Sequence, residues 1–263
     1  MIPALIVCGV LLVLYLLCFL ENRRLVVARQ TIVHAKATGT FTVMQVSDLH
    51  DLRFGRKQAR LLGAIREAQP DIIVITGDLF NRRNKRAYRN AFAFATEAVR
   101  IAPTYFAEGN HECALGETGE RFIDRIRSMG VHVLRDEYAD LPQCRLIGLR
   151  QYAPPETLSV MLDAQRLNLV LAHRPERFPL YAETGADIVL SGHAHGGQIR
   201  LFGRGLYAPQ QGFFPRYTAG IYRIGASVLY VSRGLGNTIP IPRVFDTPEL
   251  NRLVIEPKEP KGV

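Results

Sequence analysis

The sequence predicts an α/β fold for residues 40–263, in which short buried strands alternate with amphipathic helices. Asp71–Thr76 is an apolar run bounded by Pro70 and Gly77, which is typical of a buried strand. Lys57–Gln69 instead repeats its apolar residues at helical spacing. Such alternation favours β-α-β units, and ligands bind at the carboxyl ends of the strands in folds of this kind.

The composition is that of a globular protein with a sizeable core. The chain has 263 residues, 48% of them hydrophobic, and a formal net charge of +9. This charge favours an anionic partner, whether a membrane surface, a nucleic acid or a phosphorylated metabolite. The four cysteines match no zinc spacing and favour a reducing compartment. No linker that would divide residues 40–263 into two domains is evident.

The amino-terminal segment is apolar from Ile2 to Leu20, apart from Pro3 and Gly9. About 20 such residues cross the hydrocarbon core as a helix, so residues 1–21 are predicted to be a transmembrane anchor. A cleaved signal peptide is the alternative, but the chain lacks a basic region before the apolar run and a small-residue cleavage site after it.

Residues 22–39 are predicted to be a basic juxtamembrane linker that lies along anionic lipid. Its basic residues are Arg23, Arg24, Arg29 and Lys36. Because basic residues follow the predicted anchor, the positive-inside rule places the domain that follows in the cytoplasm. The expected location is therefore the inner (cytoplasmic) membrane, with a single pass.

The remaining elements are expected in chain order after the linker. The strand candidates are Thr40–Ser47, Thr104–Ala107, Val131–Leu134, Cys144–Leu149, Leu167–Ala172, Asp187–Leu190, Ile221–Arg223, Ser227–Val231 and Leu253–Ile255. The helix candidates are Tyr88–Ile101, Glu117–Met129 and part of Pro154–Gln165. After Gly197 the chain becomes rich in glycine, proline and aromatic residues.

Polar clusters follow five of the strand candidates and hold five of the seven histidines. They are Asp48-Leu49-His50, Gly77-Asp78, Gly109-Asn110-His111-Glu112, His173 and Gly192-His193-Ala194-His195. Each cluster alone is more often a cap, a turn or a structural histidine. Unrelated turns have little reason to collect five histidines, two aspartates and an asparagine at strand ends, so the set indicates one polar site.

This set of donors suits a metal site. Asp48 and His50 are two residues apart at a strand end, where alternation points both side chains the same way. Asp78 has two oxygens with which to bridge two ions, and Asn110 offers an amide oxygen. Nitrogen donors are His173, His193 and His195. Carboxylate and imidazole together suit Mn²⁺, Fe or Zn²⁺ better than Ca²⁺, and two ions ~3.5–4 Å apart suit in-line displacement at phosphorus.

The ordered clusters resemble the calcineurin-like metallophosphoesterases from about Thr40 to Ile255. The resemblance implies a four-layer α/β/β/α sandwich with two divalent ions, Mn²⁺ foremost and Fe or Zn²⁺ as alternatives. It assigns one ion to Asp48, His50, Asp78 and His195. It assigns the other to Asp78, Asn110, His173 and His193. It makes His111 the unligated histidine that stabilises or protonates the leaving oxygen.

Two stretches, His193–Ile199 and Val231–Gly236, are similar to a membrane-associated branch of this family. That branch includes bacterial enzymes acting on UDP-2,3-diacylglucosamine. The resemblance implies a phosphodiesterase or pyrophosphatase that uses metal-activated water on a lipid-linked phosphate. A phosphoprotein phosphatase, a soluble-nucleotide phosphodiesterase and a non-catalytic metal-binding scaffold are the alternatives. The expected partners are a phosphorylated, amphiphilic small molecule and membrane lipid, with no protein partner.

Four residues near the clusters, three of them arginines, are candidates for binding substrate phosphate, because guanidinium groups match phosphate oxygens. They are Asn81, Arg82, Arg83 and Arg53. A solvated start of a helix is the alternative. A nucleic-acid groove is disfavoured because the basic run is not interleaved with aromatics. Residues 202–217, called the aromatic segment below, are rich in apolar and aromatic side chains and are expected to be core or a loop packed on the sheet. Any part of the segment that is exposed near the site would receive acyl chains or rest on a bilayer.

Overall fold

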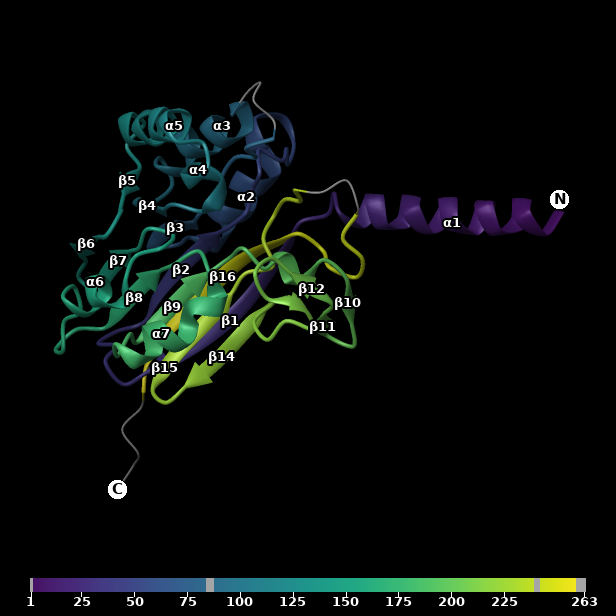
Figure 1. The fold of residues 1–263 in the computed structure, drawn as a ribbon. Coiled ribbons are helices and arrows are strands. Elements are labelled where there is room, and N and C mark those ends of the chain that lie inside the picture. The colour runs from purple at the N-terminus through teal and green to yellow at the C-terminus, as the bar shows by residue number, and fades with distance from the viewer. Residues whose placement is uncertain (1, 84–87, 239–241, 259–263) are drawn as a thin grey trace.

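The computed structural model describes residues 2–83, 88–238 and 242–258, and its strands form two stacked six-stranded sheets (Figure 1). The first sheet, in spatial order, contains β1 (Val26–His34), β16 (Glu249–Pro257), β2 (Phe41–Val46), β3 (Ile72–Thr76), β4 (Thr104–Ala107) and β5 (His132–Val133). The second contains β14 (Gly220–Ile224), β15 (Ser227–Val231), β9 (Ile188–Ser191), β8 (Asn168–Leu171), β7 (Arg145–Gly148) and β6 (Glu137–Asp140).

Both sheets are mixed. Strands β2 to β5 run parallel, as do β15, β9, β8 and β7. Strand β16 is antiparallel to β2, and the edge strands β14 and β6 are antiparallel to their neighbours. The parallel strands bring their carboxyl ends to one edge of each sheet, which is where the polar clusters begin.

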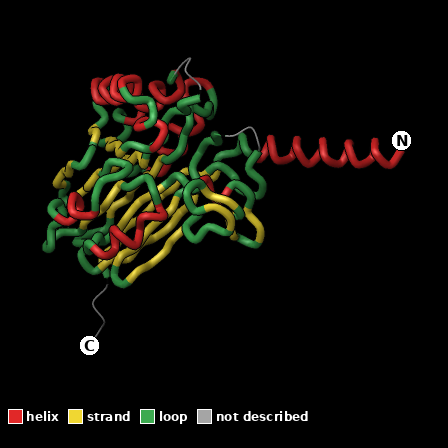
Figure 2. The backbone as a smooth tube through the Cα atoms, viewed as in Figure 1, coloured by secondary structure: helices red, strands yellow, loops and turns green. Residues whose placement is uncertain are grey.

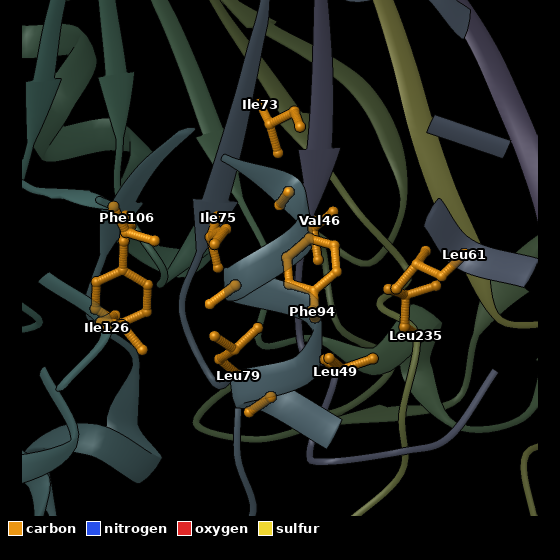
Figure 3. Packing of buried hydrophobic residues seen from close by; sticks show 14 of the residues in the cluster. Val46, Leu49, Leu61, Ile73, Ile75, Leu79, Phe94, Phe106, Ile126 and Leu235 are labelled. Carbon is orange, nitrogen blue, oxygen red and sulfur yellow. The ribbon is translucent and has the colours of Figure 1, made fainter. Parts of the chain in front are cut away.

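Helices cover the outer faces of both sheets, so the domain has four layers. The helices on the first sheet are α2 (Ala59–Ala68), α3 (Arg89–Ala98) and α5 (Glu117–Ser128), and those on the second are α6 (Pro155–Ser159) and α7 (Phe178–Glu183). Phe94, Phe106 and Ile126 belong to the core beneath the first helical layer (Figure 3). The α/β class predicted from the sequence is confirmed.

Strand β3 illustrates why the apolar runs are continuous. Ile73 and Ile75 belong to the core under the helices, whereas Ile72 and Val74 belong to the core between the two sheets. Successive side chains of a strand point to opposite faces, so a strand covered on both faces must be apolar at every position. The run Ile72–Thr76 is fully buried for this reason.

The predicted linker is wrong over much of its length, because Val26–His34 forms β1 and pairs in parallel with β16. This strand is at the edge of the first sheet, and Ile32 is its only fully buried residue. A strand so exposed on its faces needs no apolar run and therefore lacks the pattern that identified β3. The domain accordingly begins before residue 40. Short strand pairs within residues 200–213 and helix α7 were also not expected.

The apolar amino-terminal segment forms α1 (Ile2–Glu21), which projects away from the sheets (Figures 1 and 2). Among the described residues, no helix combines the length and the apolar character needed to cross a membrane. The predicted transmembrane anchor is therefore not supported.

The carboxyl end of α1 is fastened to the domain. The side chain of Asn22 donates from Nδ2 to the carbonyl of Arg243 (2.7 Å), and its Oδ1 accepts the Arg243 backbone N–H (2.9 Å). The hydroxyl of Thr247 donates to Oε1 of Glu21 (2.8 Å). Arg243 also binds the carbonyls of Gly234 and Gly236, so the base of α1 adjoins the loop that follows β15.

Candidate metal centre

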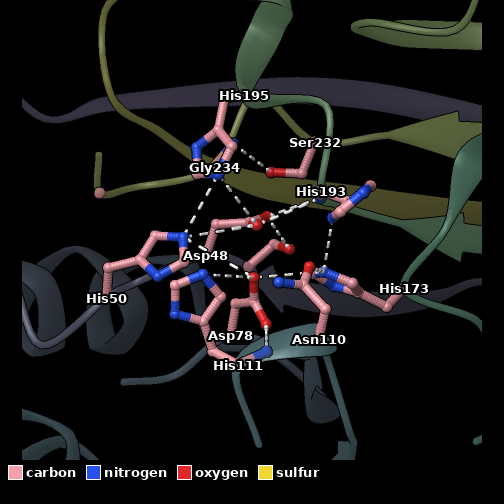
Figure 4. A network of polar contacts seen from close by, with 12 residues as sticks. Asp48, His50, Asp78, Asn110, His111, His173, His193, His195, Ser232 and Gly234 are labelled. Atoms are coloured by element: carbon pink, nitrogen blue, oxygen red, sulfur yellow. Dashed lines mark hydrogen bonds and ion pairs between the residues drawn. The ribbon is translucent and has the colours of Figure 1, made fainter. Parts of the chain in front are cut away.

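The polar clusters meet where strands of both sheets end (Figure 4). Asp48 and His50 follow β2, Asp78 follows β3, Asn110 and His111 begin the short helix α4 (Asn110–Cys113) after β4, His173 follows β8, and His193 and His195 follow β9. Seven of these eight side chains are buried and Asn110 is half-buried. The structure therefore brings together every metal-ligand candidate named from the sequence.

One group of donors surrounds His50. Its Nε2 lies 3.3 Å from Nε2 of His195, 3.8 Å from Oδ1 of Asp48 and 3.9 Å from Oδ2 of Asp78. Nε2 of His195 in turn lies 3.7 Å from Oδ1 of Asp48. These four atoms form a compact cluster of two nitrogens and two oxygens.

A second group surrounds His173. Its Nε2 lies 3.3 Å from Oδ2 of Asp78, 3.2 Å from Oδ1 of Asn110 and 3.1 Å from Nδ1 of His193. Oδ2 of Asp78 thus lies beside both groups. Oδ1 of Asp78 is held separately, because it accepts the backbone N–H of His111 (2.8 Å).

The hydrogen bonds of the rings show that both groups fit cations. Nδ1 of His50 faces the carbonyl of Phe80 (3.4 Å), and Nδ1 of His173 faces the carbonyl of Thr76 (2.7 Å). A carbonyl only accepts, so each Nδ1 carries a hydrogen, and Nε2 is the ring atom left facing the other acceptors, where it can bind a cation. Ligands ~2.0–2.2 Å from a divalent ion are separated by about 3.0–3.4 Å, close to the shorter spacings here.

Electrostatics agree with this arrangement. Burial lowers the pKa of His173, but the carboxylate of Asp78 outweighs that effect and raises the pKa to about 10. Burial lowers the pKa values of His50 and His193 to about 3. Burial raises the pKa of Asp78, yet His173 and His50 outweigh it and hold the pKa well below its usual range. A proton on His173 therefore occupies a position where positive charge is strongly stabilised.

His111 also lies within reach of an ion, since Nε2 is 3.9 Å from Oδ2 of Asp78 and the side chain groups with His50 and Asp78. The backbone N–H of Arg82, however, donates to Nδ1 of His111 (3.0 Å). With Nδ1 accepting, the neutral ring carries its hydrogen on Nε2, and ligation through Nε2 would require an imidazolate. Burial lowers the pKa of His111, which favours the neutral ring. His111 is thus a hydrogen-bond donor beside the ligand cluster.

Glu112 has a structural part in the site that sequence reasoning missed. Its Oε2 accepts the N–H groups of Asp78 (2.9 Å) and Gly109 (2.8 Å), and Oε1 accepts that of Leu79 (2.9 Å). Burial and the charge of Asp78 raise the pKa of Glu112 to about 8, whereas the three N–H groups favour the carboxylate. We assign the ionised form to Glu112, because the carboxylate accepts a hydrogen bond from each of these three N–H groups. Glu112 joins the turn after β3 to α4.

Close backbone contacts and strained conformations mark the ligand loops. Asp48, His50 and Asp78 have φ values of 50°, 49° and 53°. His193 and His195 are also left-handed, with φ values of 67° and 45°. This conformation costs a non-glycine residue about 1–2 kcal/mol and recurs at functional sites. A Cβ atom on Gly109 would lie 2.2 Å from Oδ1 of Asp78, so this glycine permits the close approach of the loop.

Among the predicted phosphate-binding residues, only Arg82 lines a pocket beside the cluster, one of about 290 Å³ that also includes Asn110. Arg53 donates to the carbonyl of Gly55 (3.3 Å), and Arg83 donates to that of Thr238 (3.2 Å). Oδ1 of Asn81 accepts the backbone N–H of Arg83 (3.0 Å). The other pocket residues were not expected from sequence: Cys113, Ala114, Gln151, Tyr152, Arg174 and Gln210.

Residues 41–197 match the family model described as calcineurin-like phosphoesterase. The chain belongs to the calcineurin-like phosphoesterases. An uncharacterized metallophosphoesterase of Campylobacter jejuni is 32% identical over 76% of this chain and 54% of its own length, so the chain spans about half of that relative. The Escherichia coli phosphodiesterase YaeI is 31% identical over 81% of each chain. A Danio rerio transmembrane protein with a metallophosphoesterase domain is 28% identical over 80% of this chain and 52% of its own length.

Family membership and the clustered donors together identify a metal-dependent phosphoester hydrolase domain with a divalent metal centre. The predicted enzyme class is confirmed. The family match ends at residue 197, before the aromatic segment. Within that segment Tyr217 is buried, whereas Phe202, Phe213 and Phe214 are exposed, so the expectation of core is met only in part. Gln210 from the same segment contacts Nε2 of His193.

Proposed function

We propose that this chain is a dinuclear-metal phosphodiesterase that cleaves an amphiphilic, lipid-linked phosphate. The observation that carries the dinuclear centre is the position of Oδ2 of Asp78, 3.9 Å from His50 Nε2 and 3.3 Å from His173 Nε2. A carboxylate oxygen beside both donor groups is suited to bridging two ions. When bound, two divalent ions activate water and neutralise charge on the phosphoryl group, and Mn²⁺ is the first to test, with Fe and Zn²⁺ next.

The ligand sets follow the two donor groups. One ion would be held by Asp48, His50, Asp78 and His195, and the other by Asp78, Asn110, His173 and His193. Supporting this assignment, Ser47 Oγ donates to Oδ2 of Asp48 (2.5 Å), and the backbone N–H of His193 donates to the same oxygen (3.0 Å). These bonds fix the carboxylate of Asp48 so that its Oδ1 faces His50 and His195.

His111 acts on the substrate rather than on an ion. Its Nε2–H faces the cluster while Nδ1 is fixed by the backbone of Arg82. A neutral imidazole in this position stabilises charge on the leaving oxygen and passes it a proton as the ester bond breaks. Arg82, with its side chain on the adjacent pocket, supplies positive charge for a phosphate oxygen.

The lipid part of the proposal rests on exposed apolar surface. Side chains of α1 such as Leu5, Leu12 and Leu17 are 69%, 59% and 57% exposed, and Phe202 and Phe214 are 104% and 82% exposed. Surfaces of this kind are stabilised by contact with lipid. Strand β12 (Tyr207–Ala208) of the aromatic segment and strand β10 (Arg200–Leu201), just before it, lie on the side of the domain from which α1 projects (Figure 1).

Basic residues supply the matching electrostatics. Arg23 and Arg24 follow Asn22 after the end of α1, and each contributes about 1 kcal/mol of attraction near anionic lipid. Because the base of α1 is fastened through Asn22 and Arg243 to the loop carrying Gly234, lipid held by α1 lies near the metal centre. We therefore propose that the enzyme acts at an anionic membrane surface, with UDP-2,3-diacylglucosamine as the first substrate to test.

The test compares a soluble diester with a lipid substrate. The Mn²⁺-loaded chain is given bis(p-nitrophenyl) phosphate in solution and UDP-2,3-diacylglucosamine in mixed micelles, with release of UMP as the signal. Leu12→Glu with Leu16→Glu, both exposed positions on α1, is expected to keep the first activity and lose much of the second. Val160→Glu, exposed on the domain itself, is the matched control.

The outcomes separate the parts of the proposal. Hydrolysis of the soluble diester without activity on lipid substrates removes the lipid assignment and favours a soluble-nucleotide phosphodiesterase. Faster turnover of phosphopeptides than of any diester favours a phosphoprotein phosphatase instead. Bound metal without hydrolysis of any of these compounds contradicts the catalytic assignment.

A further inference from the structure

Gln151, in the loop after β7, has a buried side chain with unmet hydrogen-bonding capacity. It is 3% exposed, and within the described part of the chain neither Nε2 nor Oε1 of its amide has a hydrogen-bond partner. Leaving a buried polar atom unpaired costs about 1–3 kcal/mol, and native structures pair nearly all of them. Gln151 lines the pocket beside the metal centre, which makes a ligand in that pocket the candidate partner for the amide.

The residues around Gln151 indicate the chemical class of the ligand that this pocket would bind. Tyr152 is 68% exposed, and Nη2 of Arg174 donates to its hydroxyl (2.8 Å) while the guanidinium carbon lies 4.7 Å from the ring centroid. The ring is therefore held in place yet accessible. Arg174 itself is fixed by Oε1 of Glu176 (3.0 Å). A positioned aromatic ring beside an unpaired amide suits a flat, heteroaromatic ligand.

We propose that this pocket is a subsite for the nucleobase of a nucleotide-containing substrate. The amide of Gln151 offers one donor and one acceptor, which match the adjacent donor and acceptor on the edge of a base. Tyr152 provides the stacking surface. Because Asn110 belongs both to this pocket and to the second donor group, a base bound at Gln151 places its phosphate towards the metal centre.

The character of the pocket walls excludes an acyl chain. Its lining is mainly polar or charged: Arg82, Asn110, Gln151, Arg174 and Gln210. The exposed phenylalanines of the aromatic segment do not line it. Arg82 and Arg174 add positive charge for the phosphates of a nucleotide. This inference rests on the proposed phosphodiesterase function and specifies the nucleotide half of its substrate.

The test uses two esters that release the same p-nitrophenolate. Thymidine 5′-(p-nitrophenyl phosphate) carries a base, and p-nitrophenyl phosphorylcholine does not. With the Mn²⁺-loaded full chain, Gln151→Leu is expected to raise KM for the thymidine ester about tenfold, a change of about 1.4 kcal/mol, with kcat nearly unchanged. The phosphorylcholine ester should be hydrolysed as by the parent chain.

Tyr152 provides a second pair of variants that does not disturb the core, because its side chain is exposed. Tyr152→Ala is expected to raise KM for the thymidine ester, since base stacking contributes ~1–3 kcal/mol. Tyr152→Phe keeps the ring and its contact with the Arg174 guanidinium, and should raise KM for the thymidine ester much less than Tyr152→Ala does. Equal changes for both esters in the Gln151 and Tyr152 variants would overturn the subsite and assign both residues a structural role.

A binding measurement separates this inference from the proposed function. Thymidine 5′-monophosphate and adenosine 5′-monophosphate should bind the Mn²⁺-loaded chain more tightly than ribose 5-phosphate, and Gln151→Leu should reduce the difference about tenfold. This result stands even if no ester is hydrolysed, in which case the phosphodiesterase proposal fails alone. Equal affinity for the nucleotides and ribose 5-phosphate would overturn the nucleobase subsite whatever the activity.

Discussion

Oδ2 of Asp78 lies 3.3 Å from Nε2 of His173, and the two residues come from different sheets. Asp78 follows β3 of the first sheet and His173 follows β8 of the second. The Nδ1–H of His173 donates to the carbonyl of Thr76, the last residue of β3, which fixes the ring across the gap. The centre therefore joins the carboxyl edges of both sheets, and metal binding is coupled to their packing.

Metal removal is expected to lower the thermal stability of the domain. At free metal 100-fold above the dissociation constant, one site stabilises the native state by about 2.7 kcal/mol, provided that the unfolded chain does not bind. Thermal unfolding of chelator-treated protein, followed with and without added Mn²⁺, measures the effect. An unfolding midpoint that does not depend on metal would show that these donors bind no ion in the native state.

Asp78→Asn is expected to lower metal occupancy at both positions. An amide oxygen lacks the negative charge that a bridging carboxylate shares between two cations. Metal content measured by elemental analysis should fall below one ion per chain, and hydrolysis should fall with it. Asp124→Asn, at an exposed position paired with Arg127, is the matched control and should retain metal and activity. Loss of one ion with the other fully retained would contradict the bridging role of Asp78.

His111→Ala is expected to keep the metal and lose much of the rate. Proton transfer from a positioned side chain contributes typically ~10²–10⁴-fold, and the loss should shrink with p-nitrophenolate, which needs no proton. Rates for p-nitrophenyl and alkyl leaving groups, with metal content measured on the same samples, test this. His132→Ala, at an exposed histidine stacked on Tyr105, is the control. Loss of metal from the His111 variant would make His111 a ligand.

Arg243→Met is expected to destabilise the loops that frame Asp48. Nε of Arg243 pairs with Oδ2 of Asp246 (2.8 Å), and its Nη1 binds the carbonyls of Gly234 (3.0 Å) and Gly236 (3.2 Å). Removing one partner of a buried ion pair costs 3–5 kcal/mol in typical cases, because the other charge is left unpaired.

Denaturant unfolding should show the lower stability of the Arg243→Met variant, and a metal-binding measurement should show its weaker metal affinity. Arg243 is fully buried and Gly234 packs against Asp48, so weaker metal binding should accompany the lower stability. The double variant Arg243→Met with Asp246→Leu should recover part of the stability, since it leaves no unpaired charge. A single variant as stable as the parent would show that the buried pair has no role in holding these loops.

The sequence predicted those features that depend on residue type alone. Strands buried on both faces, such as β3, are continuously apolar, and metal ligands must be histidine, aspartate or asparagine whatever the fold. Strand β1 escaped prediction because only one of its residues is fully buried. Gln151 and Tyr152 escaped because their residue types are ordinary. They form a candidate binding site only because of how the chain packs. Packing leaves the amide of Gln151 without a hydrogen-bond partner and leaves the ring of Tyr152 exposed.

The most direct test of the central claim is a metal titration of the full chain. Metal-free protein receives increasing Mn²⁺, and bound metal and hydrolysis of bis(p-nitrophenyl) phosphate are measured on the same samples. The account predicts saturation near two ions per chain, with activity rising mainly as the second ion binds. Undiminished activity in metal-free protein, or full activity with one ion bound, would contradict a dinuclear centre bridged by Asp78.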